Sequence, residues 1–180
     1  NNGVDYEYIR NIPISRSKAL KLCNSENWEP NKILGTISRL SPEKGVIILL
    51  EAFSKAIKKS PNIRLIIVGG YPEEHKNYFL KIKKIIDKEN LSEYIRILEY
   101  RQDALEILKC FDFYISSSLS EGLPISILEA VASNVPTIAT EITGNKDILP
   151  NSVFGILATP NSPESLFKAI IKMAQLNSSE

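Results

Sequence analysis

Apolar runs of strand length alternate with amphipathic segments along the chain, and this alternation constrains the fold most strongly. The run from Ile63 to Val68 is interrupted only by Arg64 and ends at Gly69-Gly70, which is typical of an interior parallel strand covered on both faces. Repetition of strand and helix favours a parallel sheet with helices on both sides. The sequence therefore predicts an α/β fold with a Rossmann-like, doubly wound parallel sheet of about six strands. The expected strands are 32–40, 63–68, 94–98, 113–116, 137–140 and 155–157.

The segments between these runs have the apolar spacing of helices. From Val46 to Ile57 the apolar residues fall on one helical face, and we expect Ser41 to cap this helix and Pro42 to begin it. The lysines of segment 72–88 fall mostly on its polar side, so we interpret them as a solvated face. Further helices are expected at 15–26, from 72 to about 88, at 104–109, from Pro124 to a left-handed cap at Asn134, and from Ser162.

Composition excludes several classes of function. The chain has 180 residues, 43% apolar and 24% charged, which suits an ordinary globular domain. Its 22 basic and 21 acidic side chains give a net charge of +1, so a strong field for nucleic-acid binding is not expected. Cys23 and Cys110 lack metal-ligand spacing and are interpreted as reduced thiols of a cytosolic protein. No apolar run reaches the roughly 20 residues of a membrane span.

The stretch from Ser116 to Ala132 joins a buried strand to a helix through a polar turn. Pro124 suits the first helical position, because its missing N–H would have no helical partner there. The N–H groups of Ile125 and Ser126 should then point outward without a partner. Outward N–H groups and the positive end of the helix dipole favour an anion. The sequence therefore predicts an anion site here, with Glu121 just before it.

Two cations precede another expected helix. Arg39 lies at the carboxyl end of the first strand, and Lys44 lies in the first turn of the helix that follows. The helix dipole disfavours a cation in the first turn by a few tenths of a kcal/mol or more. An anionic ligand shared by Arg39 and Lys44 would remove this cost, although exposed basic residues beside a helix start are also common. Because ligands of such sheets bind beyond the carboxyl ends of the strands, the cations, Glu121 and the 125–126 amides should meet at one edge. Loops 99–102 and 143–146 should lie at the same edge.

These segments together resemble a known family. Glu121 and Glu129 flank Gly-Leu-Pro, with Glu-Ala at the second glutamate and Asn-Val-Pro-Thr-Ile-Ala-Thr at 134–140. This pattern closely resembles the E-x7-E signature of the retaining "group 1" glycosyltransferases, which have the two-domain GT-B fold. Ser38-Arg39-Leu40 with Lys44-Gly45 is similar to the family's cationic element, although Ser38 stands where glycine is usual. The resemblance covers essentially the whole chain.

The resemblance implies the catalytic residues and the ligand. Arg39 and Lys44 would neutralise the diphosphate of a nucleotide sugar, and Glu121 would hold hydroxyls of the donor sugar. The donor would be linked to UDP or GDP. Because two cations are available for the diphosphate, we expect no metal and no further cofactor.

The resemblance also implies a set of substrate-binding residues. Glu129 would accept hydrogen bonds from the ribose hydroxyls. The N–H groups of Leu123, Ile125 and Ser126 would donate to phosphate or sugar. Arg101 lies in the loop that contacts the nucleobase in the family, where Glu99 replaces a usual glycine; a solvated loop would explain Arg101 equally well.

The chain start matches the same family. Asn2-Gly3-Val4-Asp5 resembles the N-G-V-D with which the first GT-B domain hands over to the second. We therefore expect an interdomain linker at 1–14, a nucleotide-sugar-binding domain at 15–180, and an acceptor-binding domain that is absent from this chain. The isolated chain would then be inactive. Alternatively, the tetrapeptide is an ordinary surface turn.

The expected function is transfer of a hexosyl unit to a glycan or a lipid-linked acceptor, in cell-surface polysaccharide synthesis. No nucleic-acid partner is expected, and the resemblance suits a cytoplasmic enzyme that can attach to the inner face of a membrane. Two rival classes stay open: a related GT-B epimerase or phosphorylase, and a non-catalytic nucleotide-binding module.

Overall fold

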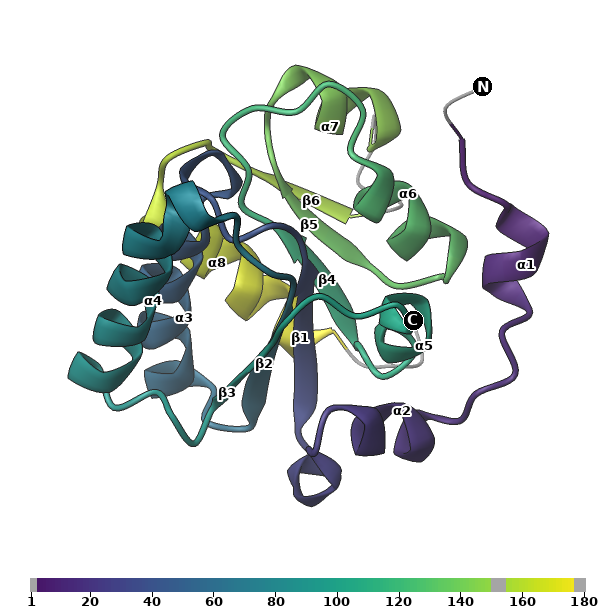
Figure 1. Ribbon diagram of the computed structural model, residues 1–180, viewed down its shortest axis with the longest axis horizontal. Helices are drawn as coiled ribbons and strands as arrows, with labels where there is room; N and C mark the ends of the chain where they lie inside the picture. Colours follow the sequence, from purple (N-terminus) through teal and green to yellow (C-terminus); the bar gives the residue numbers. More distant parts are fainter. Residues whose placement is uncertain (1–2, 150–154, 177–180) are drawn as a thin grey trace.

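The computed structural model describes residues 3–149 and 155–176 and contains a six-stranded sheet (Figure 1). Its order is β3-β2-β1-β4-β5-β6, and each neighbouring pair is parallel. The predicted doubly wound α/β fold is therefore confirmed. The strand order reverses between β1 and β4, which is the switch point where such sheets bind ligands. The strands are β1 (Lys32–Ile37), β2 (Ile63–Val68), β3 (Ile95–Leu98), β4 (Phe113–Ser116), β5 (Thr137–Thr140) and β6 (Gly155–Ala158).

Helices cover both faces of the sheet (Figure 1). On one face, Leu65 and Phe113 pack in a core with α3, α4 and α8. On the other, Ile66 and Tyr114 pack with α2, α5 and α6. Because alternate residues enter two different cores, the strands read as continuous apolar runs. The helices are α1 (Tyr6–Arg10), α2 (Arg16–Leu22), α3 (Val46–Lys59), α4 (Lys76–Lys88), α5 (Ala104–Leu108), α6 (Ile125–Ala132), α7 (Thr143–Ile148) and α8 (Pro163–Gln175).

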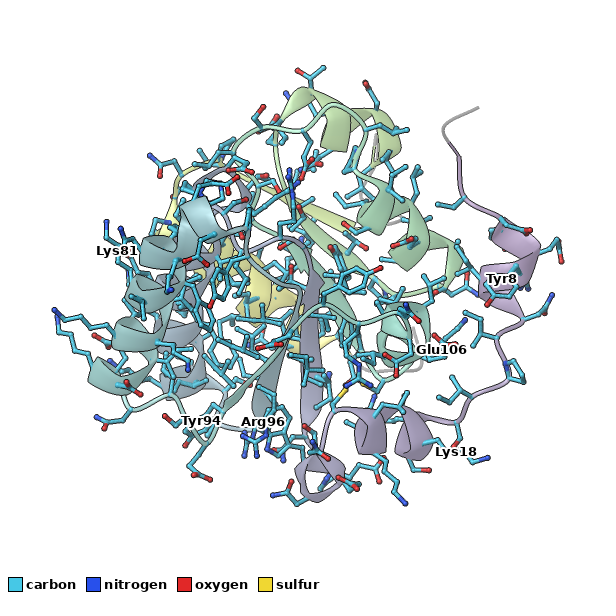
Figure 2. The ribbon with its side chains drawn as sticks, viewed as in Figure 1. Tyr8, Lys18, Lys81, Tyr94, Arg96 and Glu106 are labelled. Atoms are coloured by element: carbon cyan, nitrogen blue, oxygen red, sulfur yellow. The ribbon has the colours of Figure 1, made fainter. Side chains whose placement is uncertain are left out.

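The outer faces of the helices are solvated, as predicted for segment 72–88. All five lysines within α4 are exposed. Figure 2 shows Lys81 of α4 and Lys18 of α2 pointing outward from different sides of the molecule. Along the described residues, none of the helices combines the length and the apolarity that a membrane crossing requires.

The segment after β1 differs from its prediction. Ser41 does not cap a helix that begins at Pro42, and Lys44 is not in an α-helical first turn. Pro42–Lys44 form a separate 3-10 turn, and α3 begins after Gly45, whose φ is 63°. A Cβ at Gly45 would clash with the carbonyl oxygen of Ser117, so the chain passes too close to the β4 loop for any other residue.

Two further predictions about helices are wrong. Residues 143–146 are part of helix α7 rather than a loop. This helix has few helix-forming residues, and only Gly144 and Asn145 are buried; the Asn145 side chain anchors it by donating to the Thr140 carbonyl oxygen. Pro124 is the N-cap of α6, not its first helical residue. The predicted left-handed cap at Asn134 is confirmed by its φ of 57°.

The predicted linker contains a short helix. Asp5 caps α1 by accepting a hydrogen bond of 2.9 Å from Tyr8 N, and Ile9 is buried. Helix α1 lies beside α6 (Figure 1). Asn2 of the N-G-V-D motif lies outside the described residues, and the linker role stays a prediction. Cys23 and Cys110 are both buried and free.

The close approach at Gly45 gives a stability prediction. We expect Gly45→Ala to lower the free energy of unfolding by about 1–3 kcal/mol, because alanine is strained at a positive φ. Urea denaturation measures this change. Gly122→Ala is the matched control, since a Cβ there meets nothing within 4 Å, and it should stay within about 0.5 kcal/mol of the parent. Equal stability of both variants would contradict the close contact.

Candidate functional site

Two loops meet at the switch point, one after β1 and one after β4. Ser117 Oγ donates to the carbonyl oxygen of Lys44 at 2.8 Å. Leu119 N donates to the carbonyl oxygen of Glu43 at 2.7 Å. These two hydrogen bonds clamp loops that are more than 70 residues apart in sequence. The loops after β1 and β4 are therefore held in fixed positions at the carboxyl edge of the sheet.

An ion pair joins Lys44 and Glu121 across these loops. Lys44 Nζ lies 2.6 Å from Glu121 Oε1, and the side chains are only 16% and 14% exposed. Ser118 Oγ donates to the same oxygen at 2.7 Å. An ammonium group has three protons, and within the described residues Lys44 Nζ uses one of them for this pair. The structure thus brings two of the sequence-predicted residues together and leaves donors for a ligand.

Arg39 lies apart from this pair. Its side chain is 69% exposed, and its Nη2 lies 3.7 Å from Glu43 Oε1. Ser41 Oγ donates to the same Glu43 oxygen at 2.6 Å. This hydrogen bond, with smaller contributions that include the charge of Arg39, lowers the pKa of the Glu43 carboxyl. Arg39 is therefore loosely held and faces the neighbouring cavity.

That cavity has a volume of about 400 Å³ and opens beside the ends of β1 and β2. This is within the usual range for small-molecule sites, about 300–1,000 Å³. Glu129 of α6 reaches it from the side, and burial raises the pKa of this carboxyl. The cavity is lined by Ile37, Ser38, Arg39, Val68, Gly69, Gly70, Tyr100, Arg101, Gln102, Ala104, Leu105 and Glu129.

Arg101 lines the cavity but directs its donors into the protein. Its Nε and Nη2 donate to the two Asp103 carboxylate oxygens at 2.7 and 2.6 Å, and its Nη1 donates to the Leu22 carbonyl oxygen at 3.2 Å. This bidentate pair raises the pKa of Arg101 and lowers that of Asp103. The flat face of the guanidinium, rather than its N–H groups, is what Arg101 offers to a ligand.

The start of α6 differs from its prediction in a second respect, besides the position of Pro124. Ile125 N donates to the Leu123 carbonyl oxygen at 3.0 Å, so it is not an outward N–H without a partner. The reason is the tight turn at Pro124, whose ψ is 84°. Within the described residues, the N–H groups of Leu123 and Ser126 donate to no protein acceptor. Two of the three predicted amides therefore remain available.

Sequence reasoning missed Tyr114. Its buried hydroxyl lies 3.1 Å from the Ile37 carbonyl oxygen and 2.8 Å from Ser126 Oγ. Burial raises the pKa of this hydroxyl. Tyr114 thus ties the end of β1 to the start of α6. The available signal was a tyrosine between Phe113 and Ile115 in a buried strand, because a buried hydroxyl needs a partner.

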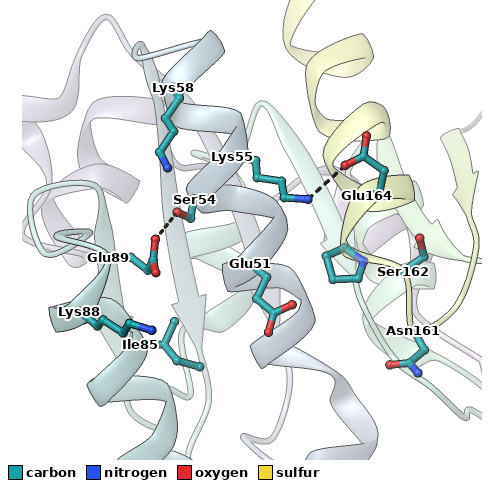
Figure 3. Close-up of a pocket in the computed structure, with 11 residues that line it drawn as sticks. Glu51, Ser54, Lys55, Lys58, Ile85, Lys88, Glu89, Asn161, Ser162 and Glu164 are labelled. Carbon is teal, nitrogen blue, oxygen red and sulfur yellow. Dashed lines mark hydrogen bonds and ion pairs between the residues drawn. The ribbon is translucent and has the colours of Figure 1, made fainter.

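A larger groove lies elsewhere, between α3, α4 and the start of α8 (Figure 3). Its volume is about 580 Å³. Lysines and glutamates line it and partly pair with one another, as in Lys55–Glu164 at 3.1 Å. Ser54 Oγ donates to Glu89 at 3.0 Å. This groove contains none of the sequence-predicted site residues and carries no excess of one charge.

Within 3–149 and 155–176, no three His, Cys, Asp or Glu side chains gather so that they could hold a metal ion.

Known proteins resemble this chain over most of its length. The family model of the glycosyl transferases group 1 matches residues 22–180. An uncharacterised glycosyltransferase of Methanocaldococcus jannaschii is 33% identical over 73% of the chain and 35% of its own length. The Escherichia coli UDP-Gal:α-D-GlcNAc-diphosphoundecaprenol α-1,3-galactosyltransferase is 32% identical over 76% of the chain and 35% of its own length. The chain therefore spans about a third of these relatives.

A solved structure resembles the fold closely. Anabaena HepE, in complex with UDP and glucose, superposes with a TM-score of 0.84 at 27% identity. The match covers 95% of this chain and 45% of HepE. Taken with the family match, this shows that the chain belongs to the group 1 glycosyltransferases and has the fold of the C-terminal half of a GT-B enzyme.

Proposed function

We propose that this chain binds the nucleoside diphosphate sugar donor of a retaining glycosyltransferase. The observation that carries the proposal is the Lys44–Glu121 pair at the switch point, next to a cavity lined by Arg39 and Glu129. A diphosphate needs cations and N–H donors, and a ribose needs an acceptor for two neighbouring hydroxyls. Both kinds of group lie along one edge of the sheet. A hydrolase pair of carboxylates is disfavoured because Glu121 is already bound to a cation.

The diphosphate would lie between Lys44 and Arg39. Lys44 has protons left after pairing with Glu121, and Arg39 is exposed and free to turn toward a phosphate. The N–H groups of Leu123 and Ser126 would add neutral donors. These groups would stabilise the negative charge that develops on the leaving diphosphate, so they would lower the barrier as well as bind the ligand. The two cations meet this charge without requiring a metal.

The sugar and the ribose would meet the two glutamates. Lys44 and Ser118 both bind Oε1 of Glu121, so its Oε2 is the oxygen available to sugar hydroxyls. Glu129 is partly desolvated, and ribose hydroxyls would supply the hydrogen bonds that its burial removes. The base would enter the cavity beside Tyr100 and stack on Arg101. UDP is the preferred nucleotide, since the E. coli relative is named for a UDP-linked donor and HepE was solved with UDP.

The acceptor would bind to a further domain. The chain matches about a third of the relatives' length, and the donor site opens at an edge where a second domain can face it. We propose a hexosyl transfer to a glycan or lipid-linked acceptor in cell-surface polysaccharide synthesis. A non-catalytic nucleotide-binding module is the second candidate, and it is favoured only by the presence of the cavity beside β1 and β2 within this chain.

Titration tests the donor site. UDP should bind the chain weakly, more tightly than GDP, and less tightly as salt screens the cations. Lys44→Ala should weaken UDP binding by about 1.5–3 kcal/mol, the scale of a hydrogen bond to a charged group. Lys55→Ala, in the groove between α3, α4 and α8, is the matched control and should change nothing. A folded sample that binds neither nucleotide would overturn the assignment.

Glu129 should lower the stability of the fold at neutral pH and strengthen the binding of UDP. Burial raises the pKa of its carboxyl in the folded state. Its ionised form therefore destabilises the fold once the pH exceeds the pKa of an unfolded glutamate, about 4.3. We expect Glu129→Gln to unfold at a higher temperature than the parent at pH 7, with the difference vanishing as the pH falls below about 4. The same variant should bind UDP about 1–2 kcal/mol more weakly.

A nucleotide control separates these two effects. If Glu129 holds the ribose, the parent protein should bind 2′,3′-dideoxy-UDP as weakly as Glu129→Gln binds UDP. Equal affinity of the parent for UDP and its dideoxy analogue would remove the ribose role, whatever the stability result.

Catalysis should require the acceptor domain. Holding the acceptor hydroxyl near the anomeric carbon is worth several kcal/mol of barrier, roughly 7–11 for an ideally aligned pair. We expect no detectable donor hydrolysis or transfer by this chain alone, and both activities once an acceptor domain is fused ahead of residue 1. The product should keep the anomeric configuration of the donor. Robust transfer by the chain alone would mean that the acceptor site lies within it, and that the two-domain proposal is wrong.

A further inference from the structure

We propose that Asn145, on α7, is a positioning residue that fixes the Glu121 loop in the donor site. This inference rests on the proposed function, because it concerns how the loop is held for a diphosphate. Among the described residues, Asn145 makes no hydrogen bond to Glu121 or Lys44, and it acts through Thr140 and Ser118.

A chain of buried and part-buried hydrogen bonds joins Asn145 to the site. Its Nδ2 donates to the Thr140 carbonyl oxygen at 2.9 Å and to Thr140 Oγ1 at 3.2 Å. Thr140 Oγ1 in turn donates to the carbonyl oxygen of Ser118. Ser118 Oγ donates to Glu121 Oε1 at 2.7 Å, the oxygen that Lys44 also binds. The path therefore runs from α7, across the end of β5, to the ion pair.

The directions of these bonds explain how Asn145 acts. A hydroxyl has one proton, and Thr140 Oγ1 gives it to the Ser118 carbonyl oxygen, so its lone pairs accept from Asn145 Nδ2. Asn145 also donates to the Thr140 carbonyl oxygen and so holds both the side chain and the backbone of Thr140. Without Asn145 these two bonds are lost, and Thr140 is less firmly oriented toward the Ser118 carbonyl. The loop that presents Ser118 Oγ to Glu121 is then less firmly held.

The backbone of α7 supports the same loop. A Cβ at Gly144 would lie 2.5 Å from the Gly122 carbonyl oxygen and 3.0 Å from that of Glu121. Helix α7 therefore abuts the loop directly beside Asn145. Only glycine permits this approach, and it restricts the positions that the loop can adopt.

Packing alone does not account for Asn145. The side chain is completely buried, and within the described residues its Oδ1 has no hydrogen-bond partner. An unsatisfied buried acceptor costs stability, and an apolar side chain of similar size would avoid this cost. A polar amide therefore stands where its two N–H bonds hold Thr140, at the cost of one unsatisfied oxygen.

The test compares UDP with UMP, because they differ only in the β-phosphate that the Lys44–Glu121 end would hold. Asn145→Leu keeps the branched shape of the side chain and removes the donors. We expect it to weaken UDP binding about tenfold, the equivalent of one net hydrogen bond, and to change UMP binding less than about twofold. Thr140→Val should show the same selective loss, and Thr140→Ser, which keeps the hydroxyl, should bind UDP like the parent.

Controls separate this role from a general loss of structure. Ser54→Ala removes a buried hydroxyl of α3 that is bonded to Glu89 at the end of α4. This variant should change stability without changing the ratio of the affinities for UDP and UMP. Asn145→Leu combined with Ser118→Ala should lose little more than either change alone, because both act on one path. If Asn145→Leu does not fold, Thr140→Val provides the same readout.

Each outcome has one meaning. Folded Asn145→Leu and Thr140→Val proteins with the parent's UDP to UMP ratio would overturn the positioning role and leave the proposed function intact. A parent protein that binds neither nucleotide would overturn the proposed function and this inference with it.

Discussion

The ion pair between Lys44 and Glu121 is the interaction on which the site depends. It joins the loop after β1 to the loop after β4, where the order of strands reverses. Because both side chains are mostly buried, they lose much of their hydration, and their attraction compensates for this only with further hydrogen bonds. Ser118 supplies one of these bonds, and Ser117 fixes the Lys44 backbone. A ligand phosphate would accept hydrogen bonds from the Lys44 protons that Glu121 does not use.

The rest of the fold keeps this pair in place. The strands are buried on both faces and give the two loops fixed starting points. Gly45 permits the first loop to approach Ser117, and Gly144 permits α7 to approach Gly122. Tyr114 then anchors the start of α6 to the end of β1. Close backbone approaches and short buried hydrogen bonds therefore position the site, while the outer helical faces remain solvated.

Sequence patterns predicted those features that depend on burial alone. The limits of β2, β4 and β5 match their predictions because each is a short, mainly apolar run bounded by turn residues and buried over nearly all its length. The pattern also placed Lys44 and Glu121 at one edge of the sheet. It did not predict α7, the 3-10 turn before Gly45, or the bonded Ile125 amide, because each depends on a contact between segments distant in sequence or on a tight turn. The Arg101–Asp103 pair was missed although its partners are two residues apart.

Mapping the amide chemical shifts of the ¹⁵N-labelled chain during a UDP titration tests the central claim most directly. If the switch point binds the nucleotide, we expect the perturbed amides to cluster at residues 38–45, 69–70, 100–104 and 117–129. The amides around Lys55, Lys88 and Glu164, in the groove between α3, α4 and α8, should stay unchanged. Perturbations confined to that groove, with none near Lys44, would contradict the donor site at the switch point.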